Sequence, residues 1–237
     1  MVEEIYRDIV DFHSHILPGA DHGTSSVEET LVQLKFAKNA GVTRIIATPH
    51  FYPHRHSVDS FLLRREKSFM SLSNEKKLVG FPHIRLGAEV LLCENLHKLP
   101  NLKELCIYGT NVMLLELPFS DVSDSHVKTV SQIMDMGIDV VLAHADLYER
   151  ASIERFIFVG AKLQINASSL TTLFKQPHIY DWIDRGDVVA LGSDIHNKYK
   201  GAYKKFLKAQ KKIGAELDYI REKSNEIWEM AKDFPQK

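Results

Sequence analysis

The sequence is poor in cysteine. Its 237 residues contain two cysteines, Cys93 and Cys106, which are too few for a disulfide framework and are not spaced as zinc ligands usually are. Phosphatases with a cysteine nucleophile need an arginine six positions further on, and Leu99 and Val112 stand there instead. A phosphatase mechanism that uses a thiol nucleophile is therefore excluded, and the cysteines are expected to pack as small hydrophobic residues.

An excess of charge of one sign is also missing. The formal net charge is −1, from 30 basic and 31 acidic residues in mixed order, so no polybasic surface for nucleic acid or membranes is predicted. The amino terminus, MVEEIYRD, lacks the pattern of a secretion signal, and no apolar stretch approaches the length of a membrane span. We expect a cytoplasmic protein that binds no nucleic acid and does not insert into membranes.

The sequence does contain an alternation of apolar strands and helical segments. Strands are expected near residues 9–15, 43–50, 83–90, 111–118, 138–144, 161–166 and 187–194. Helices are expected near residues 25–41, 58–77, 123–136 and 150–160, with two more from about 200 to 235. Seven strands that alternate with helices predict an α/β fold whose parallel sheet is closed or nearly closed into a barrel. With 44% hydrophobic residues, the chain has enough apolar material for one core, so residues 1–237 are expected to form a single domain.

Histidines and carboxylates follow most of these strands. Side chains alternate along a strand, so His13 and His15 point to the same face. In such a barrel the catalytic groups lie at the carboxyl ends of the strands. The residues at those ends are His13, His15, His50, Glu89, Glu116, His144, Asp194 and His196. The sixth strand offers Asn166, and either Asp21 or His22 could reach the same end.

This combination of side chains is typical of a metal centre. Imidazoles and carboxylates together suit manganese, zinc or iron. Four ligands are enough for one ion, so eight or nine predict two or three ions with a bridging carboxylate, as in many phosphoester hydrolases. Each residue also has a structural explanation: His50 could cap the sheet, Glu89 could be an ion-pair partner, and Asp194 could cap a helix. A metal centre explains all of them at once.

Six segments resemble, in order, the motifs of the PHP (polymerase and histidinol phosphatase) superfamily: DFHSHILPGADHG, IIATPHFY, LGAEV, LLELPFS, LAHADLY and LGSDIHN. They are most similar to its manganese-dependent protein-tyrosine phosphatases, which are linked to capsular and exopolysaccharide biosynthesis. The resemblance implies a distorted (β/α)7 barrel, three metal ions and the eight ligands above. It also implies His22 as the ninth ligand, where the branch usually has aspartate; Asp21 is the alternative. Manganese is the expected metal, with iron and zinc as alternatives.

The resemblance is less complete for substrate binding. The branch typically has a phosphate-binding arginine at the position of Leu147, and leucine cannot replace the paired hydrogen bonds of a guanidinium. After SDIHN, where the family tends to supply a further arginine, this chain has lysines. The remaining candidates for substrate binding are Arg55, Tyr148, Arg150 and Lys198. The two arginines are equally well explained as ordinary surface charges.

The function implied is hydrolysis of a phosphoester by a hydroxide held between the metal ions, without a covalent enzyme intermediate. The expected substrate is a phosphotyrosine protein, such as a bacterial tyrosine kinase, and a small phosphomonoester is the alternative. A weakened member that keeps its metals and serves as a binding module is a further alternative, which Leu147 leaves open. Amidohydrolase barrels also begin with His-x-His, but seven strands and the Asp194-x-His196 ending disfavour that class.

Overall fold

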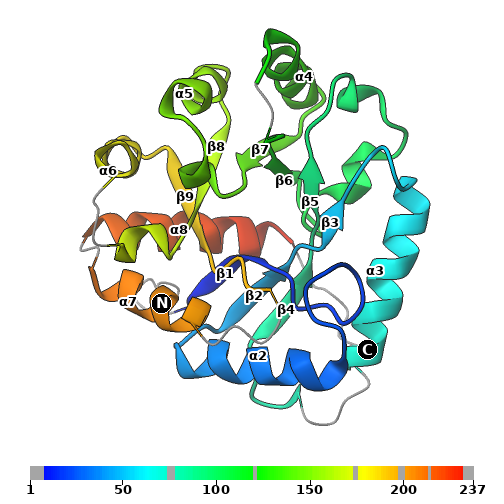
Figure 1. The fold of residues 1–237 in the computed structure, drawn as a ribbon, viewed down its shortest axis with the longest axis vertical. Helices are drawn as coiled ribbons and strands as arrows, with labels where there is room; N and C mark the ends of the chain where they lie inside the picture. Colours follow the sequence, from blue (N-terminus) through cyan, green and yellow to red (C-terminus); the bar gives the residue numbers. More distant parts are fainter. Residues whose placement is uncertain are drawn as a thin grey trace.

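A computed structural model describes residues 8–73, 78–119, 122–172, 176–196, 201–212 and 215–231. These residues form an α/β fold in which parallel strands lie inside and most helices surround them (Figure 1). The α/β class expected from the alternation of strands and helices is confirmed.

In the described residues, nine strand segments form two parallel sheets. The smaller sheet has the order β1-β2-β4, formed by β1 (Val10–Ser14), β2 (Arg44–Ala47) and β4 (His83–Leu86). The larger sheet has the order β3-β5-β6-β7-β8-β9. Its strands are β3 (His50–Phe51), β5 (Glu89–Leu91), β6 (Val112–Glu116), β7 (Asp139–Leu142), β8 (Lys162–Asn166) and β9 (Val188–Gly192). All paired strands are parallel, so their carboxyl ends lie on one side.

All seven expected strands are present, but two of them are interrupted. Thr48 and Pro49 separate β2 from β3, and Gly87 with Ala88 separates β4 from β5. Pro49 has no N–H to donate to a sheet, and a Cβ on Gly87 would lie only 3.1 Å from Cγ2 of Ile46. At both interruptions the chain passes from the smaller sheet to the larger one.

The first and last strands are connected just beyond their carboxyl ends. The N–H of His15 donates to the carbonyl oxygen of Ile195 at 3.2 Å, and the N–H of Asp194 donates to that of His13 at 2.9 Å. These bonds bring the two sheets together where the candidate ligands lie. The described strands nevertheless form two sheets and not one closed sheet, so closure into a barrel stays a prediction.

All the expected helices are present, together with an additional one over residues 177–184 that was not predicted. They are α2 (Val27–Asn39), α3 (Val58–Ser73), α4 (Asp124–Asp135), α5 (Arg150–Phe158), α6 (Pro177–Asp184), α7 (Gly201–Lys212) and α8 (Ala215–Met230). The first helix is capped by Ser26, whose side chain accepts a hydrogen bond from the N–H of Glu29 at 3.3 Å. The last four residues of the helix expected over 58–77 lie outside the described residues. Among the described helices, none has the length and apolar character that a membrane span needs.

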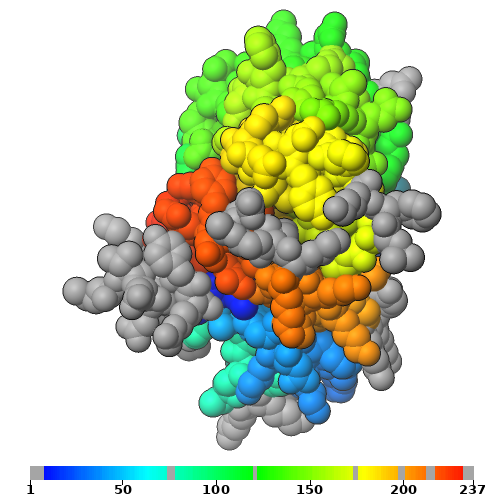
Figure 2. Space-filling view, turned by 90° about the vertical axis from the view of Figure 1, so that its left-hand side faces the viewer, coloured from blue at the N-terminus to red at the C-terminus, as the bar shows by residue number. Residues whose placement is uncertain are grey.

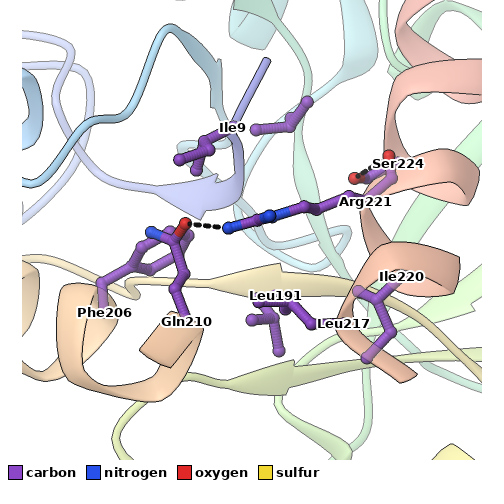
Figure 3. Close-up of a pocket in the computed structure, with 9 residues that line it drawn as sticks. Ile9, Leu191, Phe206, Gln210, Leu217, Ile220, Arg221 and Ser224 are labelled. Atoms are coloured by element: carbon purple, nitrogen blue, oxygen red, sulfur yellow. Dashed lines mark hydrogen bonds between the residues drawn. The ribbon is translucent and has the colours of Figure 1, made fainter. Parts of the chain in front are cut away.

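Helix α8 packs against the amino ends of the strands, opposite the candidate ligands. Figure 2 shows α7 and α8, in orange and red, between the blue N-terminal segments and the yellow segment of α6. Ile227 and Trp228 of α8 pack in one cluster with Val10 and Val112, which begin β1 and β6. A cavity of about 10 Å³ remains beside this packing, between the residues drawn in Figure 3, and it has no room for a substrate. The candidate ligands, in contrast, lie at the carboxyl ends of the strands.

Candidate metal centre

Glu89, at the start of β5, is the centre of the predicted ligand set. Its Oε2 atom lies 3.2 Å from Nε2 of His13 and 3.3 Å from Nε2 of His15. The same oxygen lies 2.9 Å from Nδ1 of His50, and the second oxygen, Oε1, lies 2.8 Å from Nε2 of His144. Glu89 is 1% exposed, so this carboxylate meets four imidazoles out of contact with bulk water.

Two further carboxylates, those of Glu116 and Asp194, lie within 4 Å of imidazoles of this group. Glu116, which ends β6, places Oε1 3.7 Å from Nε2 of His144 and Oε2 3.8 Å from Nδ1 of His50. Asp194, just after β9, places Oδ1 3.6 Å from Nε2 of His15. The predicted carboxylates and imidazoles from four strands, and from the segments that follow β1, β7 and β9, therefore share one site.

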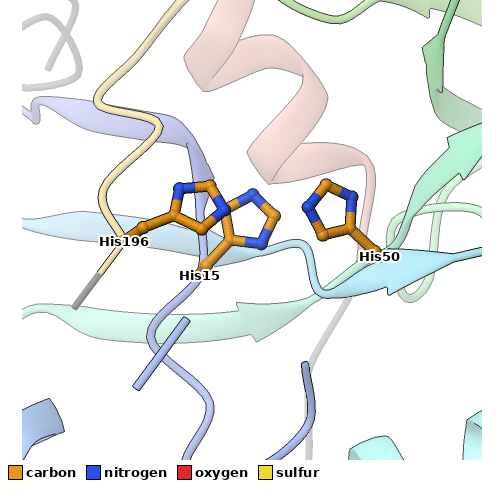
Figure 4. A group of neighbouring side chains, drawn as sticks. All are labelled: His15, His50 and His196. Atoms are coloured by element: carbon orange, nitrogen blue, oxygen red, sulfur yellow. The ribbon is translucent and has the colours of Figure 1, made fainter. Parts of the chain in front are cut away.

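His22 and His196 complete the set on its open side. The rings of His15 and His196 are stacked with their centroids 3.9 Å apart, and Figure 4 shows His50 facing the same space. His22 is exposed and lies over this group, with its ring centroid 4.6 Å from that of His50 and 4.7 Å from that of His196. All nine residues predicted as ligands are thus brought together, although their spacing in the sequence spans most of the chain.

Two of these residues have a backbone conformation that side chains rarely adopt. The φ angles are +33° at His144 and +49° at Asp194, both in the left-handed region. A non-glycine residue in such a conformation costs on the order of 1–3 kcal/mol and is found mainly where function demands it. Both backbone N–H groups are held, by the side chain of Gln164 and by the carbonyl of His13 respectively. The surrounding structure thus maintains a strained backbone that directs both side chains into the site.

Asp21 forms hydrogen bonds to two of the predicted ligands, His15 and His50. Its Oδ2 atom accepts hydrogen bonds from Nδ1 of His15 at 2.6 Å and from the N–H of His50 at 3.1 Å. Its Oδ1 atom accepts a hydrogen bond from the N–H of Gly23 at 2.8 Å. A Cβ on Gly23 would lie 2.2 Å from the carbonyl oxygen of His15, so glycine is required there. With both oxygens already bonded to donors, Asp21 orients His15, and the arrangement favours His22 as the ninth ligand.

The ionisation of the cluster reflects its mixed charges. Burial would raise the pKa of Glu89, but the neighbouring imidazoles, chiefly His13, hold it well below its usual range. Burial would conversely lower the pKa of His13, but Glu89 and Asp194 raise it to about 9. Burial and the nearby charge of His15 lower the pKa of His196 to about 4. Negative carboxylates at the centre are therefore balanced by positive charge around them.

The residues present fit divalent metal ions. Three sets of side chains offer ligand atoms within 4.8 Å of one another: His13–His15–Glu89, His50–Glu89–Glu116 and His15–His50–His196. Three buried atoms of these sets make no hydrogen bond among the described residues: Nε2 of His196, and Oε2 of Glu89 with Nδ1 of His50, which are 2.9 Å apart but not aligned for one. Buried polar atoms of this kind are costly unless a cation or a hydrogen bond satisfies them. Glu89 belongs to two of the three sets and is suited to bridge two ions.

The predicted substrate-binding arginines differ in position. The guanidinium of Arg55 lies 5.2 Å from the ring centre of Tyr52, which in turn stacks on His50 at 5.2 Å. Arg55 is therefore at the edge of the site. Arg150 is instead engaged on the outer helices, where its Nη1 lies 2.9 Å from Oδ2 of Asp181. Lys198 lies outside the described residues.

Tyr148 and Leu147 form another part of the rim. The ring of Tyr148 lies 5.7 Å from that of His144, and its hydroxyl donates to the carbonyl oxygen of Leu117 at 2.8 Å. Phe119 stacks against Tyr148 with ring centroids 6.3 Å apart and is 83% exposed. Leu147, which stands at the expected arginine position, is 57% exposed. This side of the rim is apolar and aromatic.

One buried residue that contacts the site was not predicted from the sequence. Gln164, in β8, places Oε1 3.0 Å from Nδ1 of His13 and is fully buried. The signal in the sequence was a polar residue at an inward position of the otherwise apolar strand segment LQI. Such a residue has to find hydrogen-bond partners inside the protein.

Comparison with known proteins identifies the family of this chain. A model of the family described as capsular polysaccharide synthesis, CpsB/CapC, matches residues 9–223. The chain belongs to the CpsB/CapC family. The branch inferred from the sequence motifs is thereby confirmed.

Individual relatives are distant in sequence. CapC of Staphylococcus aureus is 28% identical over 68% of this chain and 66% of its own length. The tyrosine-protein phosphatase CpsB of Streptococcus agalactiae is 24% identical over 80% of this chain and 83% of its own length. The tyrosine-protein phosphatase YwqE of Bacillus subtilis is 24% identical over 92% of this chain and 91% of its own length.

A solved structure shows the same fold. It is described as one of the crystal structures of YwqE from Bacillus subtilis and CpsB from Streptococcus pneumoniae, "unique metal-dependent tyrosine phosphatases". It superposes with a TM-score of 0.70 at 22% identity and covers 95% of this chain and 96% of that chain. The two chains thus have a common α/β fold over nearly their whole lengths.

Proposed function

We propose that this chain is a metal-dependent phosphoester hydrolase that acts as a protein-tyrosine phosphatase of the capsular and exopolysaccharide type. The observation that carries the proposal is the contact of one buried carboxylate, Glu89, with four imidazoles from three other strands and the segments that follow them. The names of the relatives CpsB and YwqE support the substrate class.

In this proposal nine residues hold two or three divalent ions, with manganese preferred and iron or zinc as alternatives. The ligands are His13, His15, His22, His50, Glu89, Glu116, His144, Asp194 and His196. Bound ions of this kind supply a hydroxide nucleophile at neutral pH and offset charge on the phosphoryl oxygens. The protein's own contribution is a largely buried ligand set in which Glu89 contacts four imidazoles and Asp21 orients His15.

The rim of the site would bind the substrate. Arg55 lies over the ring of Tyr52, which stacks on His50, and would attract the phosphate. On the other side Phe119 and Tyr148 offer aromatic surfaces that suit a phosphotyrosine ring. The partner would be a phosphotyrosine protein, such as a bacterial tyrosine kinase, encountered in the cytoplasm. The two free thiols are in keeping with a reducing compartment.

A second candidate function rests on Leu147. Because leucine provides no paired hydrogen bonds to phosphate, a small phosphomonoester substrate, or a role as a metal-bearing binding module, is the alternative.

We also infer that the two sheets are parts of one distorted (β/α)7 barrel formed by a single domain over residues 1–237. The hydrogen bonds between the ends of the first and last strands support this closure.

Turnover and metal content test the proposal together. Protein purified without chelator should contain bound metal and hydrolyse a phosphotyrosine peptide faster than sugar phosphates. Chelation should abolish this turnover, and added manganese should restore it. Glu89→Gln, which removes the central charge at nearly constant volume, should lose metal and activity, whereas Glu66→Gln at an exposed position should not. Full activity after metal removal would refute the proposal, and tight metal binding without any phosphatase activity would favour the binding module.

A further inference from the structure

We propose that Gln164 is a positioning residue of the metal centre. It fixes the proton of His13 on Nδ1, which leaves Nε2 for a metal ion, and through Asn166 it orients Asp194. The inference rests on the proposed metal site and is independent of the substrate.

The first half of this role follows from a backbone donor. Oε1 of Gln164 lies 2.8 Å from the N–H of His144 and 3.0 Å from Nδ1 of His13. Because a backbone N–H only donates, the side-chain atom that faces it has to be the amide oxygen and not the amide nitrogen. Nδ1 of His13 must then be the donor to this oxygen. In the neutral ring Nε2 therefore carries a lone pair, and it faces Glu89 at 3.2 Å.

The second half of the role follows from the amide nitrogen. Nε2 of Gln164 donates to Oδ1 of Asn166 at 3.2 Å. This places the amide nitrogen of Asn166 on the other side, where it donates to Oδ2 of Asp194 at 3.1 Å. The remaining oxygen of Asp194, Oδ1, is directed to Nε2 of His15 at 3.6 Å. One backbone N–H thus determines the direction of every hydrogen bond from His144 to Asp194.

Packing holds Gln164 in this orientation. It is fully buried, and β9 passes directly against it: a Cβ on Gly192 would lie 2.6 Å from Nε2 of Gln164 and 2.7 Å from Cβ of His13. The arrangement parallels that at His15, whose Nδ1 is bonded to Asp21. Both histidines of the His-x-His pair therefore present Nε2 to the site. They differ in that His15 has a carboxylate partner and His13 has a neutral amide.

Metal titration of the apoprotein tests this role separately from activity. Gln164→Met keeps the shape and removes all three side-chain hydrogen bonds, so affinity for one ion should fall about 10–100-fold, the range found for residues that orient metal ligands. Gln164→Glu keeps the acceptor for His13 and should bind metal more tightly than Gln164→Met. The matched control is Gln33→Met, at an equally buried glutamine in α2, and it should bind metal as the unchanged protein does.

The ring nitrogens of His13, observed by 15N NMR in the zinc-loaded protein, provide the second measurement. Nδ1 should carry the proton, and its resonance should shift in Gln164→Glu because the acceptor becomes a carboxylate. Unchanged metal affinity in Gln164→Met, or an unshifted resonance in Gln164→Glu, would overturn the inference. If Gln164→Met does not fold, the resonance in Gln164→Glu still decides. A parent protein that binds no metal would instead refute the proposed function.

Discussion

Gly192 ends β9 where the backbone packs closely against His13 and Gln164. An added Cβ would lie 2.7 Å from Cβ of His13, 2.6 Å from Nε2 of Gln164 and 3.0 Å from its Cδ. Real Cβ atoms do not approach other atoms this closely, so either β9 or both side chains must move. The substitution Gly192→Ala therefore perturbs a proposed ligand and its orienting residue with a single methyl group.

The expected loss of stability is moderate. Overpacking of a tight interior costs roughly 1–3 kcal/mol, and each kcal/mol lowers Tm by roughly 2–4 °C in a chain of this size. Gly137→Ala is the matched control because Gly137 has a φ of +77° and no atom within 4 Å of an added Cβ. Its strain costs a similar amount, roughly 1–2 kcal/mol. The two variants should be destabilised comparably for different reasons.

Metal binding should separate the two variants. Urea unfolding measures the stability of each apoprotein, and titration with manganese measures affinity and stoichiometry. Gly192→Ala should bind metal more weakly because His13 and Gln164 are displaced, whereas Gly137→Ala should bind it as the parent protein does. Equal metal affinity in both variants would show that the close packing of β9 against His13 does not position the ligand, and the reasoning would be refuted.

Three further outcomes are expected. In metal titrations, His22→Ala should lower the number of bound ions, whereas Asp21→Asn should keep that number and weaken affinity about 10–100-fold; the reverse pattern would make Asp21 the ligand. Burial raises the pKa of Cys106 to about 12, so its thiolate is negligible at pH 8, and a thiol reagent should label the half-buried Cys93 first in the folded protein. Arg150→Ala should leave kcat/KM for a phosphotyrosine peptide unchanged, because this arginine is ion-paired on the outer helices; a large loss would place it in the site.

The sequence by itself determined the residue types of the site and the strands that carry them. Apolar segments that end at or near His50, Glu116 or His144 can be recognised in the sequence. Because parallel strands present their carboxyl ends on one side, these residues were expected to lie close together. The α/β class was also predicted from the sequence, since it depends on local periodicity.

Only the tertiary structure decided which atoms meet. Gln164 contacts His13 across 151 positions of sequence, a pairing that follows from the order of β1, β8 and β9 and not from any local pattern. The separate roles of Asp21 and His22, adjacent in the chain, likewise depend on where His15 and His50 lie. Local sequence determines which side chain is available and the face of the strand it occupies. Long-range packing determines its hydrogen-bond partner, and that partner decides whether the residue faces the metal ions or orients a residue that does.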